Sequence, residues 1–353
     1  MNFAFTDEQA MIAETAKAFF DENATSERTR AAMDKDGVDR ALWHSFCQEL
    51  GLAGIALPEA HGGSGLGLVE FAILAEAAGA QVAALPMLGS LAMTAHGLAR
   101  GGSEAQKAVW LPKLASGEAI GATGLAAKVT ASGDRLSGTV DFVAHGASAD
   151  VFLIATDSAA WLVERGAAGL IVAACTTLDQ TRPFARLTLT DTPAEPLSDA
   201  AAALRAAQEG GWICVAAEAL GGAQATLDRT VGYAQERIQF GRQIGSFQAY
   251  KHRLADMMVE IEQARSAVYW AACAVDEGSD EAPIALHSAK SFAADTYFRC
   301  AGDMIQLHGG IGFTWEHDAH LFFKRAKAIQ SMLGTSAWHR ERIAQLIGLG
   351  DAA

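Results

Sequence analysis

Apolar and polar residues in the first third of the chain follow the spacing of amphipathic α-helices. Thr6 stands at a helix N-cap with Gln9 three residues on, a capping-box pattern that begins a helix through about Asp21. Helical apolar spacing returns in three further segments separated by glycine-rich loops, at 38–52, 66–79 and 103–116. The pattern predicts an N-terminal α-helical domain over residues 1–118.

From about Ala119 the pattern changes to short runs that are rich in β-branched and aromatic residues. Glycine or polar turns separate these runs, which lie at 135–144, 150–156, 160–165, 168–174 and 184–191. They predict a small antiparallel β domain over residues 119–197. Pro193 and Pro196 follow the last run, and two prolines this close disfavour both a helix and strand pairing. Residues 192–196 are therefore predicted to form a linker.

Beyond Ser198 the helical spacing returns in longer pieces, roughly 199–236, 246–277 and 283–308, followed by a shorter one near 335–348. In the second piece apolar residues recur at intervals of three, four or seven, at Leu254, Met257, Met258, Ile261, Val268 and Ala272. Such a stripe is typical of a helix packed in a bundle. The predicted fold class is α+β and mostly α, with a C-terminal four-helix bundle over residues 198–353.

Composition and charge narrow the possible partners. Hydrophobic residues make up 50% of the chain, enough for a large core. The net charge of −14 argues against nucleic acid as a partner, because binding a duplex needs clustered cations. Five cysteines without zinc-site spacing favour free thiols in a reducing compartment, and no metal is expected. No stretch reaches the roughly 20 apolar residues of a spanning helix, so a cytoplasmic protein without membrane insertion is expected.

Three local motifs carry a family resemblance. Residues 50–68 run from a predicted helix through Pro-Glu to a Gly-Gly turn. Residues 236–248 contain Arg-x-x-Phe-Gly-x-x-Ile-x-x-x-Gln, and residues 306–313 contain Gln-x-x-Gly-Gly-x-Gly-Phe. Together with the α-β-α order, these motifs resemble the acyl-CoA dehydrogenase family over nearly the whole chain. The resemblance implies that family's fold, FAD as the cofactor, an acyl-CoA substrate, and an electron-transfer flavoprotein or similar acceptor.

The motif residues also suit a flavin dinucleotide. Arginine offers a planar, permanently charged donor fork to a diphosphate, and Arg237 is the candidate. Gly309 and Gly310 let the backbone approach a ligand closely, and Gln306 can donate from its amide. The resemblance assigns cofactor contacts to Arg237, Phe240, Gln248, Gln306, Gly310, Gly334 and Thr335, in a site shared between subunits. Taken singly, a solvated helix-end charge, a core aromatic and a helix stop explain these residue types more often.

The family's catalytic carboxylate is missing from both positions where its members carry it. In the family this base removes the α proton of the thioester while a hydride leaves the β carbon for the flavin. Leu333 stands where most members have the glutamate before Gly-Thr, and Gly211 stands at the alternative position on the first bundle helix. Glu209 and Glu218 lie near Gly211 and are candidate replacements, although a solvated or capping glutamate is the commoner explanation for each. No catalytic residue is therefore assigned.

The β segment departs from the family too. The stretch that lines the flavin survives only as Thr123-Gly124-Leu125-Ala126-Ala127, and the aromatic turn over the ring as Phe142-Val143-Ala144-His145-Gly146 without its hydroxyl. Ala337 replaces a glutamine that helps hold the adenine half. The losses fall on the reacting face, whereas the motifs that reach a neighbour's cofactor remain. This pattern resembles the shortened, base-lacking subunits of heteromeric bacterial acyl-CoA dehydrogenases that act on steroid and other bulky acyl groups.

Two functions of different classes stay open. The first is FAD-dependent α,β-dehydrogenation of a bulky or steroid-type acyl-CoA by a homo-oligomer with an unrecognised base. The second is a non-catalytic partner that completes the FAD site of a catalytic homologue in a hetero-oligomer. A third and less favoured function is another flavin-dependent oxidation on the same fold, because fold does not fix function.

Overall fold

A computed structural model describes residues 5–125 and 128–349 of the chain. Two compact units make up the fold. One comprises Met1–Ser26, Ala72–Ala83 and Val215–Ala353, and the other comprises Glu27–Phe71 and Ala84–Cys214. The domain borders expected from the sequence, at 118 and 197, remain a prediction.

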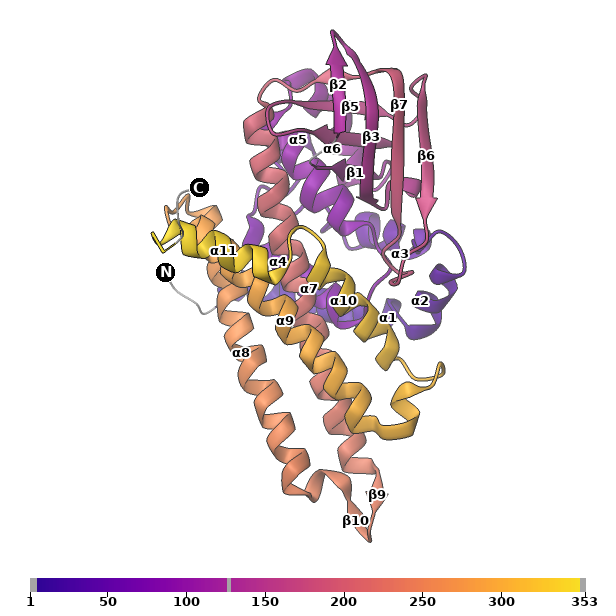
Figure 1. The fold of residues 1–353 in the computed structure, drawn as a ribbon, viewed down its shortest axis with the longest axis vertical. Helices are drawn as coiled ribbons and strands as arrows, with labels where there is room; N and C mark the ends of the chain where they lie inside the picture. Colours follow the sequence, from indigo (N-terminus) through magenta and orange to yellow (C-terminus); the bar gives the residue numbers. More distant parts are fainter. Residues whose placement is uncertain (1–4, 126–127, 350–353) are drawn as a thin grey trace. The chain divides into compact units, whose positions relative to one another are not determined.

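The N-terminal third is helical, as expected. Its α-helices are α1 Asp7–Asn23, α2 Ser26–Met33, α3 Arg40–His44, α4 Leu68–Ala80, α5 His96–Gly101 and α6 Glu104–Ala115 (Figure 1). The capping box at the start of α1 is confirmed, since the Gln9 amide N–H donates to Thr6 Oγ1 over 3.2 Å and the Thr6 amide donates to Gln9 Oε1 over 3.0 Å.

The helical segment before α5 has no counterpart in the sequence prediction. Residues Leu88–Ala95 form a π-helix that runs directly into α5, and all eight of its residues are buried. A helix buried on every side lacks the polar face by which an amphipathic surface helix is recognised. A second π-helical turn, Ser45–Glu49, extends α3, and the two together cover most of the segment predicted at 38–52.

The middle of the chain forms two four-stranded sheets. Their strands are β1 Gly121–Gly124, β2 Lys128–Ser132, β3 Arg135–Ala144, β4 Val151–Ala155, β5 Ala160–Glu164, β6 Leu170–Cys175, β7 Phe184–Pro193 and β8 Glu195–Pro196. The orders are β1-β4-β5-β8 and β2-β3-β7-β6. Every pair is antiparallel except β1 with β4, where Gly121 lies opposite Val151 in a parallel register. The chain passes through β2 and β3 between these two strands, which gives it the long connection that parallel pairing requires.

The predicted linker at 192–196 is wrong in one respect, because both prolines lie in strands. Pro193 is the last residue of β7, opposite Arg135, and Pro196 lies in β8, opposite Trp161. Neither position costs the sheet a central hydrogen bond, since Pro193 ends its strand and β8 is an edge strand. Prolines disfavour the interior of a strand, and these two prolines lie at a strand end and in an edge strand.

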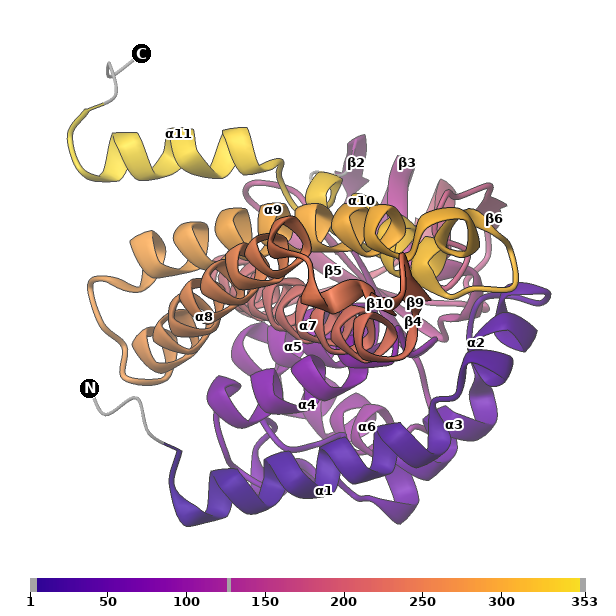
Figure 2. The same cartoon turned by 90° about the horizontal axis from the view of Figure 1, so that it is seen from below.

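The C-terminal part is the expected helical bundle. Its helices are α7 Ala200–Glu236, α8 Gln248–Asp276, α9 Ala282–His308, α10 Ala319–Ser331 and α11 Ser336–Leu346. In Figures 1 and 2, α8 and α10 run along α9, and α11 crosses near the start of α9. The sequence pattern missed α10. In the stripe predicted on α8, Met257, Ile261, Val268 and Ala272 are buried, but Met258 is exposed.

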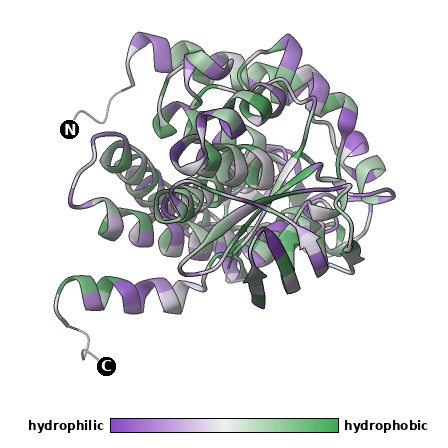
Figure 3. Cartoon of the chain, turned by 90° about the horizontal axis from the view of Figure 1, so that it is seen from above, coloured by the Kyte–Doolittle hydropathy of each residue, from purple (hydrophilic) through white to green (hydrophobic). Residues whose placement is uncertain are grey.

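Glycines allow the helices of this unit to approach closely. A Cβ on Gly222 of α7 would stand 2.4 Å from the ring of Tyr297 on α9, and one on Gly221 would stand 1.8 Å from the carbonyl oxygen of Glu76. Figure 3 shows hydrophilic and hydrophobic residues alternating along α11, in which Ser336 and His339 are buried. Among the residues that the structure describes, no helix combines the length and apolar character needed to cross a membrane.

Candidate cofactor site

The first group of candidate residues lies where α7 ends. Arg237 follows the last residue of α7, and its amide still donates to the carbonyl of Tyr233 over 2.9 Å. The chain then forms a hairpin of β9 Ile238–Gln239 and β10 Arg242–Gln243, at the tip of the bundle in Figure 1. The two turn residues, Phe240 and Gly241, both have positive φ, at 53° and 76°. Positive φ at both positions is the geometry of a two-residue type I′ hairpin turn.

The hairpin presents its aromatic and cationic side chains to solvent. Phe240 is 92% exposed, and its ring lies perpendicular to that of Phe247, with ring centroids 6.2 Å apart. The Arg242 guanidinium lies over the Phe247 ring, 4.0 Å from its centroid. Arg237 is exposed, and its guanidinium makes no hydrogen bond or ion pair within residues 5–125 and 128–349. Its donor fork is therefore free for an anionic ligand.

The second motif packs against the same tip. Gln248 is the first residue of α8 and is exposed, and Gln306 is exposed near the end of α9. The Tyr250 hydroxyl donates to the Leu307 carbonyl over 3.1 Å, which fixes the start of α8 to the end of α9. Beyond α9 the chain turns through Gly309 and Gly310 into the 3-10 helix Gly309–Phe313. A Cβ on Gly310 would have no other atom within 4 Å, so its surface is open to a ligand.

A ring stack joins the two motifs. The ring of Tyr233, one turn before Arg237, lies 4.5 Å from the His308 imidazole at an interplanar angle of 22°. His308 Nδ1 bonds to the Met304 carbonyl over 2.8 Å and therefore carries the hydrogen. Burial lowers the pKa of His308, which the Met304 carbonyl opposes and nearby His317 reinforces, so the ring is neutral near pH 7. The tip thus gathers Arg237, Phe240 and Gln248 from one continuous segment, and Gln306 and Gly310 from a second segment far from it in sequence.

The other two candidates lie elsewhere on the bundle. Gly334 and Thr335 form the turn between α10 and α11, where the Gly334 carbonyl accepts a hydrogen bond from Lys290 Nζ. Lys290 precedes His308 on α9 by about eighteen residues, or about 27 Å of helix at 1.5 Å per residue. Thr335 caps α11, with Oγ1 accepting from the Trp338 amide over 3.3 Å. Within one chain the seven candidates therefore form two groups, one at the tip and one at this turn.

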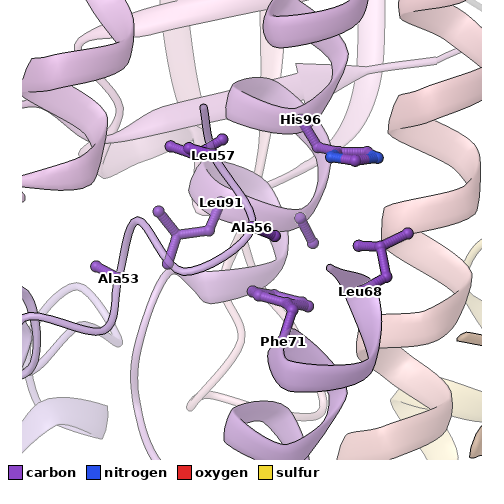
Figure 4. Close-up of a pocket in the computed structure, with 8 residues that line it drawn as sticks. Ala53, Ala56, Leu57, Leu68, Phe71, Leu91 and His96 are labelled. Atoms are coloured by element: carbon purple, nitrogen blue, oxygen red, sulfur yellow. The ribbon is translucent and has the colours of Figure 1, made fainter. Parts of the chain in front are cut away.

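Sequence reasoning missed a small cavity in the other unit. Its lining consists of His96, at the start of α5, and the apolar side chains of Ala53, Ala56, Leu57, Leu68, Phe71, Leu91 and Ala92. Figure 4 shows the His96 imidazole among the lining side chains. The cavity holds about 10 Å³ of space for the centre of a water molecule, room for about one water. Within the described residues, Nδ1 of His96 has no hydrogen-bond partner. Burial, and then nearby Arg100, lowers the His96 pKa to about 4. A lone histidine in an apolar run was the only signal in the sequence.

Known proteins match the chain over almost its full length. Residues 6–118 match the acyl-CoA dehydrogenase N-terminal domain and residues 202–348 match the acyl-CoA dehydrogenase C-terminal domain. The chain belongs to the acyl-CoA dehydrogenase family. The cofactor that this membership implies is FAD. In the part of the chain that the structure describes, no group of three histidine, cysteine or acidic side chains could hold a metal ion.

Three relatives place the chain more closely within the acyl-CoA dehydrogenases. It is 37% identical over 329 residues to acyl-CoA dehydrogenase IpdE2 of Mycobacterium tuberculosis, covering 93% of each protein. A chain in the structure of the ChsE4–ChsE5 complex from Mycobacterium tuberculosis superposes with a TM-score of 0.91 at 30% identity, over 100% of both chains. A chain of the Tcur3481–Tcur3483 steroid acyl-CoA dehydrogenase superposes with a TM-score of 0.88 at 32% identity, over 98% of this chain and 99% of that one.

The two positions at which the family resemblance predicts a base carry no carboxylate. Leu333 adopts a left-handed backbone with φ of 54°, and Gly211 lies inside α7. Glu209 is half-buried on α7, and burial raises its pKa, which Arg205 and Arg100 oppose. Glu218 is only 4% exposed, so the interpretation of a solvated or capping glutamate is wrong for this residue. Gly79 of α4 packs against its backbone, where a Cβ would stand 2.2 Å from the Glu218 carbonyl oxygen.

The β sheets carry the remaining candidates for the flavin-lining surface. Phe142 is 76% exposed with φ of 56°, at a bulge between Val140 and Val143 in β3. The Thr123 hydroxyl is buried against that of Thr94, 2.8 Å away, and is engaged within the protein. Ala126 and Ala127 lie outside the described residues. An exposed aromatic side chain is thus retained here.

Proposed function

We propose that this chain is a subunit of an FAD-dependent acyl-CoA dehydrogenase that acts on bulky, steroid-type acyl-CoA thioesters. In this assembly its bundle tip completes a cofactor site, and a homologous catalytic chain supplies the carboxylate base. One observation carries the proposal. The cofactor motifs at the tip are intact and turned to solvent, whereas residue 333, where the base belongs, is leucine.

The side chains at the tip fit a flavin dinucleotide. Arg237 offers free guanidinium donors for a diphosphate, and Gln306 offers an exposed amide. Phe240 presents an exposed aromatic face, and the open surface at Gly310 lets a ligand approach the backbone. When bound, FAD supplies the acceptor for the hydride that leaves the β carbon of the thioester. The residues of this chain bind and orient the cofactor.

Removal of the α proton requires a base, which the turn carrying Leu333 lacks. Removal of the α proton needs a positioned base near the thioester, and the leucine side chain cannot accept a proton. The proposal therefore places that step on a glutamate of a homologous chain. As the α proton goes to this carboxylate, the electron pair of the α C–H bond forms the new C=C bond, and the electron pair of the β C–H bond leaves with the hydride to the acceptor that bound FAD would supply.

Exposed apolar side chains around the tip support an interface. They are Ile238, Phe240, Ile311, Phe313 and Trp315, each at least 49% exposed. Clustered exposed apolar side chains on a protein surface mark interaction sites. The relatives named for ChsE4–ChsE5 and Tcur3481–Tcur3483 are assemblies of two named components, which supports a heteromeric partner. Electrons would leave through an electron-transfer flavoprotein or similar acceptor, as the family resemblance implies.

Co-expression with a homologue that carries the glutamate, to be sought among the neighbouring genes, tests the proposal. Each chain alone and the pair together are analysed for mass by light scattering, for flavin per chain, and for oxidation of a steroid-type acyl-CoA with an artificial electron acceptor. We expect stoichiometric FAD and turnover only in the pair. A monodisperse 37.0 kDa chain that binds FAD and turns over substrate alone would contradict it. A pair that forms without bound FAD would also contradict it.

Independent catalysis is the second candidate, and the raised pKa of Glu209 favours it. A carboxyl group with a raised pKa in a partly buried position is suited to general base catalysis. This candidate predicts flavin reduction by the isolated chain, which the same measurements detect.

A further inference from the structure

Two consecutive carbonyl oxygens in the turn between α10 and α11 are held by buried nitrogen groups. His339 Nε2 lies 3.0 Å from the Leu333 carbonyl oxygen, and Lys290 Nζ donates to the Gly334 carbonyl oxygen. His339 and Lys290 are both 0% exposed. A third buried group, His287, completes the arrangement with its Nδ1 lying 2.8 Å from Nδ1 of His339. We call His287, Lys290 and His339 the turn clamp.

The contacts of the clamp dictate where its protons lie. The Leu333 carbonyl can only accept, so His339 Nε2 must carry a hydrogen. If His339 is neutral, its Nδ1 is an acceptor, and His287 Nδ1 must be the donor. A charged His339 would set two N–H groups against each other. Burial first, and then nearby Lys290 and His287, lower the pKa of His339 to about 3, in agreement with a neutral ring.

The backbone that the clamp holds is one that leucine rarely adopts. Leu333 has φ of 54°, and Gly334 follows with φ of 98°. A non-glycine residue in the left-handed region persists only where its surroundings over-determine it. The ring of Trp338 and His339 Nε2 also close over Gly334, where a Cβ would meet them at 2.6 Å and 2.9 Å. Asp295 anchors the start of α11 by accepting from Ser336 Oγ over 2.8 Å.

We propose that His287, Lys290 and His339 are positioning residues that hold Leu333 and Gly334 in the left-handed conformation, and so fix the turn that carries Gly334 and Thr335 to the cofactor. The step to the cofactor rests on the proposed function, whereas the clamp itself does not. These contacts explain why the turn keeps a strained backbone at residue 333 although that residue has no carboxylate. The clamp maintains the geometry of the turn independently of the side chain at position 333.

The first test uses the chain alone and needs no cofactor. Nitrogen-15 spectra of the histidines should show His339 protonated at Nε2 and His287 at Nδ1, both neutral at pH 7. Hydrogen exchange of a peptide covering 330–336 is then compared in wild type, His339→Gln, His339→Leu and Lys290→Met. The Gln amide can replace the Nε2 donor, so His339→Gln should stay within about twofold of wild type. His339→Leu and Lys290→Met should exchange at least about tenfold faster there, with a peptide from the middle of α8 unchanged.

Specific results overturn the clamp. They are the opposite tautomers, equal exchange in His339→Gln and His339→Leu, or faster exchange spread over the whole bundle. The second test measures FAD dissociation from the co-expressed assembly, where His339→Leu should weaken binding about tenfold and His339→Gln should not. Unchanged FAD binding in His339→Leu overturns the link to the cofactor while the clamp stands. If Arg237→Ala also leaves FAD bound, the proposed function fails instead.

Discussion

The His308 imidazole stacks on the ring of Tyr233 with the two centroids 4.5 Å apart. Tyr233 lies one helical turn before Arg237, and His308 comes directly before Gly309. The stack therefore sets the distance between the arginine at the end of α7 and the glycine turn at the end of α9. A cofactor that contacts both groups depends on this packing, and the following predictions separate binding from folding.

Arg237→Ala should reduce FAD content strongly and leave the fold intact. The guanidinium is exposed and makes no hydrogen bond or ion pair in the described residues, so its loss should change the free energy of unfolding by no more than about 0.5 kcal/mol. Losing a charged phosphate partner should cost about 1.5–3 kcal/mol of FAD binding. Flavin absorbance per chain and thermal unfolding are measured together. Arg299→Ala, which removes a surface ion pair with Glu260, is the matched control and should keep its FAD. Equal flavin content in both variants would remove Arg237 from the site.

Alanine at Gly310 and at Gly309 should have opposite signatures. At Gly310 a Cβ meets no atom within 4 Å, so the free chain should keep its stability and lose FAD affinity, because the methyl group intrudes on the ligand surface. At Gly309 the backbone, with φ of 62° and ψ of −140°, is one that essentially only glycine adopts, so Gly309→Ala should lower the free energy of unfolding by about 1–3 kcal/mol. Denaturant unfolding without cofactor and FAD titration distinguish the two effects. Normal FAD affinity in Gly310→Ala would show that the ligand does not approach this turn.

If the isolated chain dehydrogenates acyl-CoA, one of two glutamates should carry the proton. Glu209→Gln should then reduce flavin reduction by a factor of about 10²–10⁴, the usual effect of losing a general base, without a matching loss of stability. Glu218→Gln should instead destabilise the fold, because Glu218 is buried in α7. Rapid-mixing measurement of flavin reduction, together with thermal unfolding, tests both.

Leu333→Glu tests whether only the carboxylate is missing. This variant returns a base to a turn that already holds the left-handed backbone. If the isolated wild-type chain shows no flavin reduction, Leu333→Glu should gain it. Failure of the gain would point to the altered β sheets, where Phe142 and the Thr123 stretch depart from the family pattern.

His96 should make the protein less stable in acid. The folded pKa of about 4 lies below the ordinary histidine pKa of 6.5, so between these values the unfolded chain binds more protons than the folded chain. Stability from this residue is complete above pH 6.5 and is lost as the pH falls toward 4. Between pH 7 and 4, wild type should lose on the order of 3 kcal/mol more than His96→Leu. Denaturant unfolding at both pH values measures this difference, and parallel pH profiles would refute it.

The sequence alone determined the order of structures and the family. Amphipathic spacing located α1, α8 and α9, and the alternation of β-branched residues located β3 and β7 within a few residues. These patterns are local, because one helix or strand face must be apolar wherever the element packs. The Arg237 and Gly310 motifs were equally readable, since a cofactor contact needs a specific residue type at a specific spacing.

Tertiary structure decided what depends on neighbours distant in sequence. The π-helix Leu88–Ala95 is buried all round and so lacks a polar outer face, whereas α10 was missed although its sequence is amphipathic and it packs along α9. Only folding places the motif ends together at the bundle tip while leaving Gly334 and Thr335 about 27 Å away along α9. The burial of Glu218 and the neutral His339 likewise follow from surrounding atoms. Desolvation and backbone strain arise from packing in three dimensions, and no residue spacing encodes them.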